Sequence, residues 1–94
     1  MIKIYKFKAD KNINEHRLRV PQAYKFTPNK EYIGRCKDFN IMLIYDDLGN
    51  GIEFDIPKVC NLKLYDSYVV AFNMVDSFEV KNKKELNNEI LKTK

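Results

Sequence analysis

The sequence has little of what several classes of protein require. Its 94 residues include no tryptophan, three glycines and two cysteines, and its longest unbroken apolar runs, 41–45 and 68–72, are five residues each. A membrane-spanning helix needs about 20 consecutive apolar residues, so we expect none. Two cysteines without a C-x-x-C spacing exclude a disulfide scaffold and a zinc knuckle. Three glycines are too few for a loop that cradles phosphate groups.

The first eight residues, MIKIYKFK, also lack the apolar core of a signal peptide, because lysine alternates with apolar residues. We therefore expect a cytoplasmic protein, in a bacterial host cytoplasm, with reduced thiols. Lys, Asn, Ile, Tyr and Phe make up 45 of the 94 residues, and A/T-rich codons encode all five. This composition is typical of an A/T-rich bacterial or phage genome.

The chain does contain enough apolar and aromatic residues for a folded core. Hydrophobic residues make up 45% and aromatic residues 13% of it, which is more than disordered proteins contain. Its length matches one domain, and no linker or internal repeat divides it. We expect a single β domain over residues 1–80, followed by a helix or tail over 81–94.

The hydrophobic period is mostly two, which is typical of β-strands. Residues 2–20 predict a hairpin in which Leu18 and Val20 face inward. The stretch between Pro21 and Pro28 is predicted to be irregular, because proline breaks a strand ladder, with Tyr24 and Phe26 as core anchors. Further strands are predicted over residues 30–37, 39–46, 52–56 and 68–75. The last of these is apolar on both faces, which suits a central strand or a barrel strand.

The clearest local signal is the hairpin between 39–46 and 52–56. Asn50-Gly51 lies in its turn, and Asn-Gly supplies the positive φ angles that tight hairpins need. A short helical turn is predicted over 58–62.

The tail changes to a helical period. Leu86, Ile90 and Leu91 form a narrow apolar stripe, and Asn82 with Glu85 approximates a capping box. These features predict a short amphipathic helix that packs onto the preceding sheet. The alternatives are that its stripe docks in a groove of a partner or forms a dimer contact.

About six short strands and one small helix predict a mostly β fold, either a small SH3-like barrel or a rolled antiparallel sheet with a short C-terminal α-helix. Three stretches carry a resemblance: KEYIGR at 30–35, MLIYDDLG at 42–49 and IEFDIP at 52–57. Over roughly residues 29–75 the chain resembles small SH3-like β-barrel proteins encoded by phages and mobile elements of low-G+C Gram-positive bacteria. The resemblance implies a fold and a phage-type origin, and it brings no catalytic residues.

Charge is segregated along the chain. The net charge of +4 divides into +7 over residues 1–37, −6 over 38–80 and +3 over 81–94. A nucleic-acid binder is expected to spread positive charge over a continuous face. A dipolar surface is instead common on proteins that bind other proteins.

The acidic half predicts a protein-binding site at the hairpin. Four carboxylates are expected to crowd one end of it: Asp46, Asp47, Glu53 and Asp55. The calcium-loop pattern fails here, since with Asp46 first the third position is Leu48 and the twelfth is Pro57. We therefore expect no metal and no cofactor. Clustered carboxylates steer association with a basic partner.

No catalytic constellation is apparent. His16 is the single histidine, and its spacing from Cys36 and Cys60 does not indicate a nucleophile–base pair. We expect an exposed histidine and two buried thiols. The chain also lacks a G-x-S-x-G motif, a P-loop and a dinucleotide-binding fingerprint. An enzyme is therefore not expected.

The alternative site is a basic amino-terminal face. Single-strand binders combine a basic groove with aromatic side chains on which bases stack. The basic residues of this alternative are Lys3, Lys6, Arg17, Arg19 and Arg35. The interleaved aromatic residues are Tyr5, Phe7, Tyr24 and Phe26.

Together these observations favour a non-enzymatic protein-interaction module. The expected role is that of a phage-type accessory protein that binds and modulates or inhibits a host protein in replication, transcription or defence. The alternative is a nucleic-acid-binding β-barrel. We expect no membrane partner and a monomer or small homo-oligomer.

Overall fold

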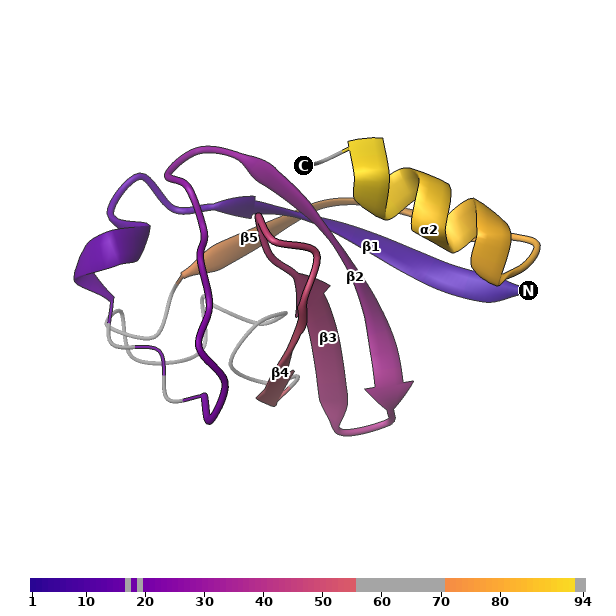
Figure 1. Ribbon diagram of the computed structural model, residues 1–94, viewed down its shortest axis with the longest axis horizontal. Coiled ribbons are helices and arrows are strands. Elements are labelled where there is room, and N and C mark those ends of the chain that lie inside the picture. Colours follow the sequence, from indigo (N-terminus) through magenta and orange to yellow (C-terminus); the bar gives the residue numbers. More distant parts are fainter. Residues whose placement is uncertain (17, 19, 56–70, 93–94) are drawn as a thin grey trace.

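The computed structural model describes residues 1–16, 18, 20–55 and 71–92. These fold into a five-stranded antiparallel sheet with a C-terminal helix (Figure 1). The mostly β prediction with a short C-terminal helix is therefore confirmed. The elements are β1 (Ile2–Ala9), the 3-10 helix η1 (Ile13–Glu15), β2 (Glu31–Asp38), β3 (Ile41–Tyr45), β4 (Gly51–Asp55), β5 (Phe72–Val80) and α2 (Lys83–Lys92).

Strand β1 organises the sheet. The strand order is β4-β3-β2-β1-β5, so β1 pairs with β2 on one side and with the distant β5 on the other. Side chains alternate across a strand, and in β1 both faces are buried. Phe7 and Ala9 face an inner core, whereas Ile4 faces a second core on the outer side of the sheet.

The sheet is rolled around the inner core. β4 and β5 are the outermost strands in the order, yet the rings of Phe54 on β4 and Phe72 on β5 lie 5.5 Å apart, centroid to centroid. Phe26, from the segment that links β1 to β2, packs edge-on against Phe72 at 4.9 Å. Edge-to-face pairs of this kind are the favoured aromatic geometry. Side chains therefore join the two outer strands, as a rolled antiparallel sheet requires.

Helix α2 covers the outer side of β1, β2 and β5 (Figure 1). Leu86 is buried against Ile4, Ile33 and Val80, and Ile90 packs beside it. The helix begins as the sequence predicts: the Asn82 side chain accepts a hydrogen bond from the Glu85 backbone N–H at 3.0 Å. The third residue of the predicted stripe, Leu91, is 61% exposed and does not belong to the contact.

The predicted hairpin over residues 2–20 is wrong. β1 pairs with β2 and β5, while residues 13–15 form η1, and Leu18 and Val20 lie outside any strand. Asp10 starts this departure, because its side chain accepts a hydrogen bond from the Asn12 backbone N–H and turns the chain. Leu18 and Val20 nevertheless pack against the inner core, so their inward orientation is confirmed.

The predicted central strand over 68–75 is also wrong in position. β5 begins at Phe72 and lies at the edge of the sheet. Residues 73–77 are exposed, and a bulge interrupts the register opposite Lys6 and Phe7. A bulge of this kind is typical of an edge strand. Residues 68–70 of this prediction, and the helical turn over 58–62, lie outside the described residues.

The β3–β4 hairpin is confirmed, but its turn differs from the prediction. The positive φ angle belongs to Gly49, at 82°, and Gly51 is already the first residue of β4. Strand β3 starts at Ile41 rather than at residue 39. Phe39 consequently lies in the preceding turn.

A close approach of two strands at Gly34 gives a first prediction. A Cβ at this position would lie 2.7 Å from Phe7 Cε2 and 3.0 Å from the Leu43 carbonyl oxygen. Gly34→Ala is therefore expected to destabilise the fold by about 1–3 kcal/mol, because backbone and a buried ring must both move. Urea unfolding measures this. Gly51→Ala is the matched control, since its nearest neighbour is the Tyr45 ring at 3.3 Å, and an equal loss in both variants would contradict the prediction.

Candidate interaction surface

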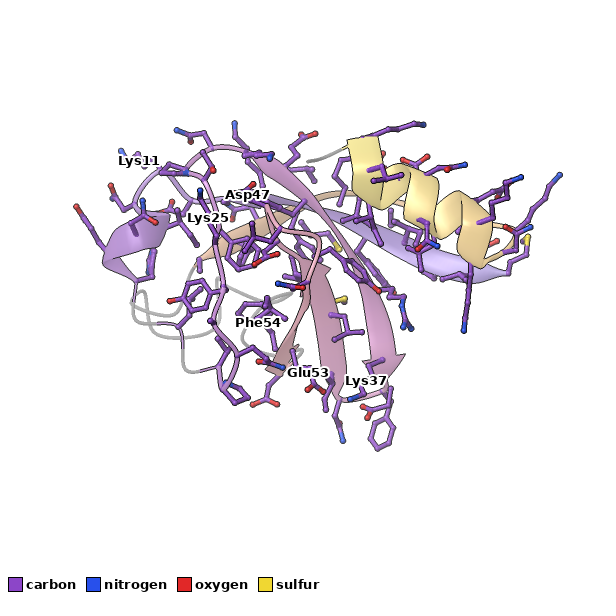
Figure 2. All side chains as sticks on the ribbon, in the orientation of Figure 1. Lys11, Lys25, Lys37, Asp47, Glu53 and Phe54 are labelled. Carbon is purple, nitrogen blue, oxygen red and sulfur yellow. The ribbon has the colours of Figure 1, made fainter. Side chains whose placement is uncertain are left out.

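The four carboxylates of the predicted acidic site do not lie at one end of the hairpin. Asp46 and Asp47 directly follow β3, whereas Asp55 pairs with Ile41 and Glu53 pairs with Leu43, toward the other end. Figure 2 shows Asp47 near Lys25 at one end and Glu53 near Lys37 at the other. The expectation of a single crowded end is therefore corrected, because Glu53 lies opposite the middle of β3 and Asp55 opposite its first residue, whereas Asp46 and Asp47 follow its last residue.

Asp46 is a buried residue of the fold. It is 3% exposed, and its carboxylate accepts three backbone N–H groups: those of Leu48 and Asn50 on one oxygen and that of Lys25 on the other. The first two bonds shape the β3–β4 turn, and the third fixes the segment between β1 and β2 against it. Asp46 therefore offers little charge to an external partner.

Asp47 is engaged in the same way. Its carboxylate accepts hydrogen bonds from Thr27 Oγ1 at 2.7 Å, Lys30 Nζ at 2.7 Å and Tyr32 OH at 2.9 Å. Its backbone N–H donates to the Lys25 carbonyl. We call the contacts of Asp46 and Asp47 with residues 25–32 the aspartate clamp, since they hold the 10–30 connection onto the β3–β4 hairpin.

The clamp perturbs two ionisable groups. Burial raises the pKa of the Asp47 carboxyl, but the hydrogen bonds from Lys30, Thr27 and Tyr32 outweigh it and hold the pKa below its ordinary value of 3.8. Burial raises the pKa of the Tyr32 phenol above 10.0. Asp47 is therefore ionised and Tyr32 is neutral at neutral pH, as the bond from Tyr32 to Asp47 requires.

The other two carboxylates are more exposed. Glu53 bonds Lys37 Nζ at 2.8 Å and Gln22 Nε2 at 3.1 Å. The bond to Glu53 raises the pKa of the Lys37 ammonium. Asp55, at the end of β4, is exposed. Of the predicted acidic site, these two residues keep a position at the surface.

A second prediction concerns the clamp. Asp46→Ala removes the acceptor of three backbone N–H groups, and unsatisfied donors are expensive, so we expect a loss of about 2–4 kcal/mol in the free energy of unfolding. Glu79→Ala, at an exposed position of β5, is the control, with an expected change within about 0.5 kcal/mol. Urea denaturation of both variants measures the difference. If Asp46→Ala were as stable as the wild type, the structural role of Asp46 would be refuted.

A third prediction follows from the lowered pKa of Asp47. A carboxyl with a depressed folded-state pKa contributes stability that is complete above its unfolded-state pKa, and this contribution disappears as the pH falls through the folded-state value. The ordinary value is 3.8, so the urea midpoint of the wild type is expected to fall between about pH 5 and about pH 2. Asp47→Asn, already weakened at neutral pH, should fall less steeply. A wild-type slope in Asp47→Asn would contradict the assignment.

The structure places the residues of the alternative basic site in different surroundings. Lys3 and Lys6 lie in β1, and Arg35 lies in β2, where its Nε donates to Tyr45 OH at 2.9 Å. Lys6 lies 3.9 Å from a Glu31 carboxylate oxygen. Arg17 and Arg19 lie outside the described residues.

The aromatic residues interleaved with this basic site mostly belong to the core. Phe7 and Phe26 are buried, and Tyr5 packs against the inner core. Tyr24 is 38% exposed and packs against the Phe26 ring at 5.7 Å. Three of the four rings are therefore held by the fold and are not platforms for a base.

The charge segregation of the sequence is not kept in space. In the β1–β5 ladder, Lys3 stands opposite Glu79 and Lys6 stands opposite Asp76. Opposite charges in such positions attract weakly and offset each other. The antiparallel pairing of a basic strand with an acidic one therefore removes the expected dipole along this part of the sheet.

The expectations for histidine and cysteine need correction. The His16 side chain is only 14% exposed, and its Nε2 lies 3.1 Å from Asp10 Oδ2. This hydrogen bond lowers the pKa of the Asp10 carboxyl. Cys36 is exposed, not buried, because it lies near the end of β2 beyond the inner core. Cys60 lies outside the described residues.

The least expected feature is the turn between β2 and β3. Phe39 is 87% exposed there, although the prediction placed it in a strand. Asp38 Oδ1 accepts a hydrogen bond from the Asn40 backbone N–H at 2.8 Å, so the polar neighbours of Phe39 shape the turn. We call residues 38–41 together with Asp55 the Phe39 tip. The Asp and Asn that flank Phe39 were the sequence signal for this turn.

Phe39 contrasts with the other described phenylalanines. Four of them are buried in the inner core, and one packs partly buried against the outer core: Phe7, Phe26, Phe54, Phe72 and Phe78. Isolated apolar residues at a surface are common. A phenylalanine ring that is almost fully exposed is less common. The Phe39 ring takes no part in the hydrogen bond that shapes the turn, and we therefore take the Phe39 tip as the candidate site.

Within the described ranges, no three His, Cys, Asp or Glu side chains are placed to hold a metal ion. No helix in the part of the chain that the structure describes has the length and apolar character needed to cross a membrane.

Comparison of the chain with protein-family models, curated proteins and solved structures gives no significant match. The resemblance to phage SH3-like proteins therefore stays a prediction.

Proposed function

We propose that this chain is a non-enzymatic protein-binding module that acts through the Phe39 tip. The observation that carries the proposal is the 87% exposure of Phe39 in a turn held by Asp38 and Asn40. Interfaces are enriched in aromatic residues, and a few such side chains supply most of the binding free energy. The Asp38 hydrogen bond restricts the backbone of the turn, so less backbone entropy is lost when the tip binds.

The proposed surface is not the acidic end of the hairpin that the sequence predicts. Asp46 and Asp47 are engaged in the aspartate clamp, so the surface moves to the other end of β3, where Glu53 and Asp55 lie. The composition of the chain favours a phage or another mobile element as its source. We accordingly seek the partner among host proteins of low-G+C Gram-positive bacteria, in replication, transcription or defence.

The fourth prediction tests the class of partner. The protein, immobilised through its amino terminus, is incubated with lysate of such a bacterium, with and without nuclease. A protein retained in stoichiometric amount after nuclease treatment is the expected result. Retention that disappears with nuclease, and falls steeply with salt, would instead favour the nucleic-acid alternative, because phosphate contacts release counterions. Absence of any retained protein would contradict the proposal.

A further inference from the structure

We infer that Asn50 is a site of spontaneous chemical modification. The Gly51 backbone nitrogen converts the Asn50 side chain into a cyclic imide, which water then opens to an aspartyl or an isoaspartyl residue. This inference goes beyond the proposed function and is independent of it, because Asn50 directly precedes β4 at one end of the hairpin and Phe39 lies at the opposite end of β3.

The reaction is an intramolecular acyl transfer that needs water as its sole co-reactant. The Gly51 nitrogen loses its proton to solvent, and its electron pair forms a bond to the side-chain carbonyl carbon of Asn50. The side-chain amide nitrogen takes up a proton and leaves as ammonia, so a five-membered succinimide ring closes. Water then adds to one of the two ring carbonyls, and the bond from that carbonyl to the ring nitrogen breaks. A carboxylate remains, and nothing is oxidised or reduced.

The sequence singles out this asparagine. Asn50 is the one asparagine of the chain that glycine follows, and the other nine precede residues with larger side chains. Asparagine is thermolabile, and a side chain on the next residue hinders the approach of its backbone nitrogen. Glycine has no Cβ and allows that approach. Ring closure is therefore least hindered at Asn50.

The structure directs the attacking nitrogen away from the β3–β4 ladder. The Asn50 carbonyl accepts a hydrogen bond from the Asp46 backbone N–H at 2.9 Å, and the Asn50 N–H donates to Asp46 Oδ1 at 2.9 Å. Both backbone groups of Asn50 therefore point toward the end of β3. Successive residues of a strand alternate in this respect, so the Gly51 N–H points to the outer edge of the sheet, where β4 is the outermost strand.

The same contacts favour the other half of the reaction. A hydrogen bond to a carbonyl polarises its peptide unit, so the bond from Asp46 to the Asn50 carbonyl makes the Gly51 N–H a better acid. Asn50 is exposed, and its side-chain amide makes no hydrogen bond to a described residue. Asn82 is the contrast, because its side-chain oxygen accepts the Glu85 N–H at 3.0 Å.

The isoaspartyl product is expected to open the aspartate clamp. In this product the chain runs through the former side chain of Asn50, which inserts a methylene group into the backbone and displaces the carbonyl that accepts the Asp46 N–H. A new carboxylate stays on the Cα of the residue whose N–H lies 2.9 Å from Asp46 Oδ1. Asp46 is 3% exposed, so salt screens the repulsion between the two carboxylates poorly.

The fifth prediction concerns ageing of the intact chain. The purified protein is incubated in warm, mildly alkaline buffer, because the deprotonated Gly51 nitrogen is the nucleophile. We expect a species with a mass higher by one dalton, whose net charge is one unit below the +4 of the fresh protein, and ion exchange separates it. Peptide mapping should place the change at Asn50 and leave Asn82 intact.

Two variants test the chemistry at this position. Gly51→Ala should form the acidic species several-fold more slowly, because the added Cβ hinders ring closure, and its nearest neighbour at 3.3 Å is the Tyr45 ring. Asn50→Gln keeps the amide but would have to close a six-membered ring, so it should accumulate less of the species than the wild type. Thermal unfolding checks that both variants fold.

The separated isoaspartyl form tests the effect on the clamp. Its urea midpoint should lie below that of the fresh protein. Asn50→Asp is the matched control, because it carries the same additional charge on an unaltered backbone, and its midpoint should lie closer to that of the wild type. An isoaspartyl form as stable as Asn50→Asp would overturn the effect on the clamp.

The same incubation in urea shows whether the folded turn reacts. An Asn50 that stays intact in buffer while the unfolded chain is modified would overturn the inference, since the fold would then prevent the reaction. Equal rates in the wild type and in Gly51→Ala, or modification spread evenly over the asparagines, would also overturn it. None of these results bears on protein binding, which the lysate experiment tests with fresh protein.

Discussion

The contact between the two outermost strands is the constraint on which the rest of the structure depends. Phe54 of β4 and Phe72 of β5 meet with their ring centroids 5.5 Å apart, and Phe26 lies against both. A sheet of this length that stayed flat would leave its apolar face exposed to water. Rolling it around three phenylalanines buries that face, and it requires the 10–30 connection to supply one of the rings.

The need to hold the 10–30 connection, which carries Phe26, explains the role of Asp46 and Asp47. The connection contains no strand among its described residues, so it has to be held in place by side chains. Asp46 and Asp47 do this through backbone N–H groups, Thr27, Lys30 and Tyr32. Charges that the sequence analysis assigned to a partner are therefore used within the fold, and the candidate surface moves to the end of β3 beside Phe39.

The sequence analysis was accurate where local chemistry decides the result. The β3–β4 hairpin and the helix with its Asn82 cap were predicted because their signals lie within a few residues of one another. It failed for residues 16, 18 and 20 and for the position of β5, where pairing with a distant strand decides. It also misplaced Phe39, because an apolar residue before an apolar run is counted as part of the strand.

The sequence by itself determined that this chain folds as a mostly β protein with a small C-terminal helix, since periodicity and capping are properties of neighbouring residues. Only the tertiary structure decided which charged side chains are available to a binding partner. It paired Lys3 and Lys6 of β1 with acidic residues of β5, and it separated Asp46 and Asp47 from the other two hairpin carboxylates. The reason is physical: strand pairing brings together residues far apart in the chain, and no local pattern encodes which strand will be the neighbour.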